Sequence, residues 1–195
     1  MFGKLYRKIY ANLIHPVINS VAPVQQVSWG VAVGMFVGLT PTMGVQMYIV
    51  MMIWFFARYV LRIRFNLPVG AALVWITNPV TVIPIYYMFL VTGYPVLDML
   101  GLRNGDALTY EIFASRLQFI MDSGGTGQVI EQGTQFLLVE LGWPMLVGGF
   151  VYAMPVAIFS YFFTMKWLTE YRKAKAIKEG LSYEQWREKH ETDGK

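Results

Sequence analysis

The chain has 195 residues, of which 55% are hydrophobic and 14% are charged, and its formal net charge is +4 at pH 7. An average soluble domain has about 45–50% apolar and about 25% charged residues, so this composition predicts an integral membrane protein with one domain. The lack of cysteine excludes disulfides and thiolate metal sites, and the two histidines, His15 and His190, are too widely separated to suggest a shared site. We therefore expect neither a metal nor a cofactor.

The basic residues are concentrated at three places along the chain. Fourteen of the 16 Lys and Arg residues lie within Lys4–Lys8, Arg58–Arg64 and Lys166–Lys195. By the positive-inside rule these three segments face the cytoplasm, which places both termini on that side. Their chemistry suits anionic lipid headgroups, and we expect no nucleic-acid partner.

The first 20 residues are predicted to form an amphipathic helix. Apolar residues recur at helical spacing from Phe2 to Val17, against a polar side that includes Lys4, Arg7 and Lys8. This pattern is typical of a helix in the cytoplasmic interface of the membrane. A helix that packs against the protein's own cytoplasmic face would have the same pattern, and the sequence leaves both interpretations open.

Residues 21–168 are predicted to form a transmembrane domain with two broken apolar stretches. A turn at Thr40–Gly44 interrupts Val31–Phe56, and a turn at Thr77–Thr81 interrupts Val69–Val91. A break in a membrane helix frees backbone groups that only protein or a water-lined cavity can satisfy. The residues predicted to make the breaks are Pro41, Gly44 and Pro79.

Each broken stretch is predicted to be a helical hairpin. The first pairs residues 23–39 with 45–61 and has both ends cytoplasmic; it either spans the membrane or re-enters on the same side. Glycines at four-residue spacing give its first helix a face suited to close helix packing, namely Gly30, Gly34 and Gly38. In the second hairpin about nine residues precede the break, too few to cross a hydrocarbon core of about 30 Å. A further apolar helix continues to Leu100.

The remaining chain is predicted to hold one more span. Residues 101–135 contain few basic residues and are predicted to be an extracytoplasmic loop. A last apolar helix begins near Phe136 or Trp143 and ends at Lys166. It contains several glycines and prolines, so we expect it to be kinked, and residues 169–195 are predicted to form a cytoplasmic tail. The predicted fold is therefore an all-α polytopic membrane protein with two broken hairpins, a kinked C-terminal transmembrane helix and an N-terminal interfacial helix.

Uncharged polar side chains gather at the two breaks, and arginines lie near the cytoplasmic ends of the hairpins. Half-helices that begin after a break direct the positive ends of their dipoles at an anionic group, and neighbouring side chains can add hydrogen bonds. Arginine can bind a phosphate through two parallel hydrogen bonds. The predicted ligand-binding residues are Thr40, Thr42, Gln46, Thr77, Asn78, Thr81, Arg58 and Arg62. Alternatively, the polar groups cap the broken helices and the arginines extend to the lipid headgroups.

The motifs around the breaks resemble a bacterial family. They are the glycine repeat from Gly30 to Gly38 with Leu39-Thr40-Pro41, Gly44 and Gln46, then Arg64-x-Asn66-x-Pro68 and Trp75-Ile76-Thr77-Asn78-Pro79. Together they are similar to the DUF2062 family (domain of unknown function 2062) over roughly residues 10–165. The resemblance implies a small multi-pass protein of the bacterial inner membrane and transfers no catalytic residue.

These observations favour binding over catalysis. The sequence contains no phosphate-binding glycine loop, metalloprotease motif or serine elbow, so we expect no enzyme and no catalytic residue. The leading hypothesis is that the protein binds or translocates a phosphate-bearing lipid. The alternative is a non-catalytic subunit or assembly factor of a larger membrane complex. Expected partners are membrane lipids, together with further copies of this chain or other membrane proteins.

Overall fold

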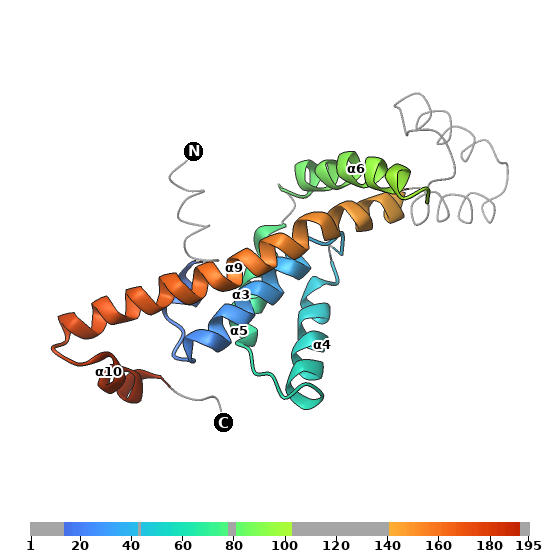
Figure 1. The fold of residues 1–195 in the computed structure, drawn as a ribbon. Helices are drawn as coiled ribbons and strands as arrows, with labels where there is room; N and C mark the ends of the chain where they lie inside the picture. The colour runs from blue at the N-terminus through green and yellow to red at the C-terminus, as the bar shows by residue number, and fades with distance from the viewer. Residues whose placement is uncertain (1–13, 43, 78–80, 103–140, 192–195) are drawn as a thin grey trace. The chain divides into compact units, whose positions relative to one another are not determined.

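The computed structural model describes residues 14–42, 44–77, 81–102 and 141–191. All regular secondary structure in these ranges is helical, with no strand, which confirms the all-α fold class (Figure 1). Most of the predicted N-terminal amphipathic helix lies outside the described residues; the part that is described contains the short helix α2 (His15–Ile18). The predicted loop 101–135 lies outside them from residue 103 onward.

The chain divides into two compact units. The first comprises Met1–Thr81 and Tyr152–Lys195, and the second comprises Val82–Val151. The long helix α9 (Gly142–Lys178) contributes residues to both units. The candidate site residues lie in the first unit.

The first unit is built around two helices that run in the same direction. They are α3 (Val24–Gly38) and α5 (Leu67–Leu73), which continues as the short 3₁₀ helix η2 (Val74–Ile76) (Figure 1). A Cβ atom added to Gly30 would lie 2.6 Å from the carbonyl oxygen of Asn66, at the start of α5. One added to Gly38 would lie 2.8 Å from the Cγ2 of Ile76, at the end of η2. The predicted glycine face is therefore a helix-packing surface, because a side chain there would collide with the neighbouring helix.

Helix α4 (Gln46–Tyr59) follows α3 in the chain and packs against both α3 and α5. Val50 on α4 is fully buried and would contact a Cβ atom on Gly70 of α5 at 3.3 Å. α3 has 15 residues and α4 has 14, which correspond to about 22 Å and about 21 Å of rise. Both helices are thus shorter than a hydrocarbon core of about 30 Å.

The C-terminal part of α9 packs against α3. Leu168 is fully buried in one apolar cluster with Val24 and Val27 of α3, and the rings of Trp29 and Tyr161 lie 4.8 Å apart. The apolar sequence ends at Lys166, but the helix continues to Lys178. A turn at Gly180, whose φ is 69°, then leads into α10 (Tyr183–His190).

The second unit pairs α6 (Val82–Met99) with the first residues of α9. The carbonyl of Pro144 occupies the position that a Cβ atom on Gly93 would take, and the carbonyl of Phe89 does the same for Gly148. Helices α6 and α9, with 18 and 37 residues, are long and apolar enough to cross a membrane. The sequence predicted both apolar helices at these places.

Enlarging Gly34 should destabilise the first unit. A Cβ atom there would lie 2.5 Å from the carbonyl oxygen of Gly70 and 2.6 Å from the Cβ of Leu73. We expect Gly34→Val to cost about 1–3 kcal/mol or more, because the obstructing atoms include backbone. Thermal unfolding of the detergent-solubilised protein measures this cost. The control is Ala174→Val on the exposed side of α9, which should leave the melting temperature nearly unchanged.

Candidate functional site

The two predicted breaks meet at one end of the first unit. Because α3 and α5 run in the same direction, the turn after Gly38 and the turn after Ile76 lie side by side. The hydroxyl of Thr77 donates a hydrogen bond to the carbonyl oxygen of Gly38. Thr40, Gln46 and Thr77 are all buried there. Two predicted site residues, Asn78 and Pro79, lie outside the described residues.

The threonine hydroxyls at this end bind backbone oxygens that the breaks leave free. Thr40 Oγ1 donates to the carbonyl of Val37 at 2.7 Å, and its oxygen lies 2.9 Å from Thr42 Oγ1. Thr81 Oγ1 donates to the carbonyl of Ile76 at 2.8 Å. These contacts are the ones that the capping interpretation requires. A ligand contact by the four threonines stays a prediction.

Gly44 and Gln46 have different environments at this end. Gly44 has a φ of 95°, in the left-handed region that favours glycine, and it ends the turn that contains Pro41. Gln46, the first residue of α4, is only 7% exposed. Its Nε2 has no hydrogen-bond partner among the described residues. The side-chain N–H groups of Gln46 therefore donate no hydrogen bond within the described part of the chain.

The opposite end of the first unit contains a cavity of about 370 Å³. Two arginines line it, Arg58 near the end of α4 and Arg64 in the segment before α5. The guanidinium of Arg58 lies over the ring of Trp54, 5.2 Å from its centroid. We call this space the arginine cavity; its lining is Val21, Ala22, Gln26, Trp54, Arg58, Arg64, Phe65, Asn66, Leu67 and Pro68.

Arg64 was missed by the sequence analysis, which predicted Arg62 instead. Arg62 is exposed, has a φ of 56° in the turn that follows α4, and does not belong to the cavity lining. Both residues belong to the same basic cluster, but Arg64 is also part of the motif Arg64-x-Asn66-x-Pro68, which was a signal that Arg62 lacks. Sequence spacing predicts neither the left-handed conformation of Arg62 nor the position of Arg64 at the cavity.

Asn66 organises the polar part of the arginine cavity. Its side-chain oxygen accepts a hydrogen bond of 3.0 Å from the backbone N–H of Val69 and so caps the N-terminus of α5. Its backbone N–H donates to the carbonyl of Gln26 at 2.9 Å, and its Nδ2 donates to Ser20 Oγ at 2.9 Å. Through its side chain and its backbone N–H, Asn66 therefore connects α5, α3 and the segment before α3.

The arginine cavity combines two permanent positive charges with a mainly apolar lining. Guanidinium groups recognise phosphate and carboxylate oxygens, and the ring of Trp54 stabilises the cation beside it. Such a lining suits a molecule with one anionic group and an apolar part. Among the described residues, no group of three or more acidic or histidine side chains is placed to hold a metal ion.

The fold and the site define a class of protein. In its described residues the chain is all-helical, two of its helices are long and apolar enough to cross a membrane, and a cavity lined by two arginines lies at one end of the first unit. The chain belongs to the family described as "uncharacterized protein conserved in bacteria (DUF2062)", whose profile matches residues 7–176. This match confirms the resemblance found in the motifs around the breaks. No curated protein and no solved structure matches the chain.

Replacing Gln46 by an apolar residue should not destabilise the folded protein. A buried donor without a partner costs about 1–3 kcal/mol, and methionine has a similar volume without the amide. We therefore expect Gln46→Met to keep or raise the melting temperature in detergent. The matched control is Gln25→Met at an exposed position of α3, where we expect little change. A marked loss of stability in Gln46→Met alone would mean that the amide has a structural partner.

Proposed function

We propose that the protein is a non-enzymatic, multi-pass protein of the bacterial inner membrane that binds a phosphate-bearing lipid in the arginine cavity. The observation that carries the proposal is that Arg58 and Arg64 line one cavity whose other walls are mainly apolar. A phosphate group would take hydrogen bonds from the guanidinium groups. The acyl chains would leave along the apolar surface beside it.

The exposed surface of the first unit supports insertion into a membrane. The outer side of α4 consists of large apolar side chains, with Met52 at 72% and Phe55 at 59% exposure. The middle of α9 presents Phe159 at 68% and Phe162 at 65%. Soluble proteins rarely expose apolar patches of this extent, whereas lipid tails cover them without cost.

The lengths and charges of the helices support an orientation. Helices α3 and α4 are shorter than the hydrocarbon core, so we propose that their hairpin re-enters the membrane and keeps both ends in the cytoplasm. The arginine cavity then lies at the cytoplasmic interface, where the phosphates of the inner leaflet are found. The end with Thr40 and Gln46 would lie deeper, where the threonine caps satisfy backbone groups that lipid cannot.

A lipid accounts for the cavity better than a small free anion. Leu67, Phe65 and Pro68 form part of the lining, and their side chains offer no hydrogen bond to a hydrated phosphate ion. The segment before α3 adds Val21, which is 57% exposed. An amphipathic molecule can contact the arginines and the apolar residues of the lining at the same time.

Removing either cavity arginine should weaken lipid binding. One charge-assisted hydrogen bond contributes about 1.5–3 kcal/mol, so we expect Arg58→Gln and Arg64→Gln each to raise the Kd for dioctanoyl phosphatidic acid by about tenfold or more. Binding can be measured by calorimetry on the full chain in uncharged detergent. Arg62→Gln is the matched control, because it removes the same charge from the same cluster outside the cavity.

Two further arms make this test decisive. If inorganic phosphate competes as strongly as the phosphatidic acid binds, the ligand is a free anion and not a lipid. An equal loss of affinity in all three arginine variants would show that binding depends on general surface charge and not on the cavity, which would contradict the proposal. A protein partner that co-purifies in fixed stoichiometry, without lipid binding, would favour the role of a complex subunit.

A further inference from the structure

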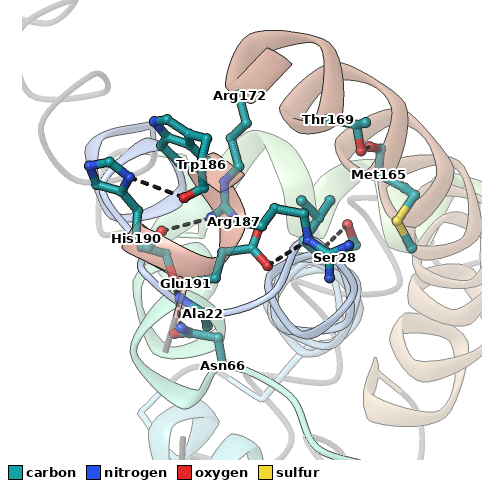
Figure 2. Close-up of polar contacts among 12 residues, drawn as sticks. Ala22, Ser28, Asn66, Met165, Thr169, Arg172, Trp186, Arg187, His190 and Glu191 are labelled. Atoms are coloured by element: carbon teal, nitrogen blue, oxygen red, sulfur yellow. Dashed lines mark hydrogen bonds and ion pairs between the residues drawn. The ribbon is translucent and has the colours of Figure 1, made fainter. Parts of the chain in front are cut away.

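A buried arginine connects the C-terminal tail to the first unit. Arg172 on α9 is 1% exposed, which makes it the largest fully buried side chain among the described residues. Figure 2 shows Arg172 beside Glu191, to whose Oε1 its Nη1 donates at 2.6 Å. Its Nη2 donates to the backbone carbonyl of Ser20 at 2.7 Å. Burying a guanidinium group without such partners is energetically costly. The contacts with Glu191 and Ser20 are therefore needed to keep Arg172 buried.

Helix α10 is folded against α9 around this arginine. Trp186 is 5% exposed, and its ring lies under the guanidinium of Arg172, 5.9 Å from ring centroid to Cζ. The indole N–H of Trp186 donates to Glu179 at 3.2 Å, and the ring of His190 stacks on it. The capping box of Ser182 begins the helix. These contacts place Glu191, directly after α10, where its carboxylate meets Arg172.

Glu191 is shared between two arginines. Its Oε2 accepts a hydrogen bond of 3.1 Å from Nε of Arg187, while its Oε1 is bound to Arg172. The side chain of Glu191 is only 7% exposed, so water competes little with these bonds. Removing this carboxylate would leave the buried Arg172 with the carbonyl of Ser20 as its described hydrogen-bond acceptor.

Ser20 connects this network to the arginine cavity. Its hydroxyl oxygen accepts hydrogen bonds from Asn66 Nδ2 at 2.9 Å and from the backbone N–H of Ala22 at 3.3 Å. Ala22 and Asn66 line the cavity, as does Val21, which follows Ser20 in the chain. The carbonyl of Ser20 is thus held by α9, and its hydroxyl is held to the start of α5.

We propose that Arg172 is a positioning residue for the arginine cavity. Together with Glu191, it holds Ser20 in place. Ser20 in turn fixes the cavity wall made by Val21, Ala22 and Asn66 in the position that binds a lipid phosphate. Detaching α10 therefore loosens this wall and weakens binding, although no residue of α9 or α10 touches the ligand. This inference rests on the proposed lipid-binding function and adds control of the cavity by the C-terminal tail.

The test loosens the network at Glu191 and observes the cavity wall. In full-length Glu191→Gln, amide hydrogen exchange at residues 20–26 and 66–69 should become faster, because the wall opens more often. The Kd for dioctanoyl phosphatidic acid should rise by about five- to tenfold, which is less than the loss of one charge-assisted hydrogen bond to the phosphate, because the variant loosens the wall and removes no group that binds the ligand. Glu188→Gln, at an exposed position of α10, is the matched control and should change neither quantity.

A second variant and a second ligand separate positioning from general stability. Trp186→Ala detaches α10 by another route and should have the same two effects as Glu191→Gln. Binding of dioctanoylglycerol, which has no phosphate, should change little in both variants. A general loss of the fold would instead weaken the binding of both ligands equally. Unchanged exchange at the wall in both variants would overturn the proposal, and so would faster exchange with an unchanged Kd.

The same experiment separates the two proposals. If the wild-type protein does not bind phosphatidic acid, the lipid-binding function fails. The exchange data then still report whether Arg172 holds the wall. If the wild type binds the lipid, and both tail variants bind it equally well, only the positioning role of Arg172 is wrong.

Discussion

The close contact between the backbones of α3 and α5 is the constraint on which the rest of the first unit depends. Gly34 and Gly70 meet with no side chain between them, and the two helices run in the same direction. This arrangement brings both chain breaks to one end and places Asn66 beside Gln26 at the other. A larger residue on the shared face would push the two helices apart, and the contacts at both ends of the pair would then be lost together.

The two ends of this helix pair satisfy different physical requirements. At the breaks, short hydroxyl side chains bind carbonyls of their own or the neighbouring helix, which removes the main cost of interrupting a helix in an apolar environment. At the other end, the positively charged side chains of Arg58 and Arg64 line a cavity. The described contacts of the threonines at the breaks are thus helix caps, and the arginines supply the binding chemistry that we propose.

Three arginines show how environment decides the role of one residue type. Arg58 lies over Trp54 at the cavity, Arg62 occupies a left-handed turn in solvent, and Arg172 is buried with Glu191. The sequence assigned Arg58 and Arg62 to the same site and treated Arg172 as one of many charges in a solvated tail. A charge cluster predicts a basic surface, but it does not predict which guanidinium is desolvated.

The sequence by itself determined the helical class, the apolar helices, the positions of the breaks and the packing role of the glycine face. These features depend on composition and on spacing within single segments, which local physical chemistry controls. Only the tertiary structure decided that the two breaks meet, that Arg64 lines the cavity and that Ser20, Arg172 and Glu191 form one network. Those contacts join residues far apart in the chain, so they depend on how helices pack, which no local pattern encodes.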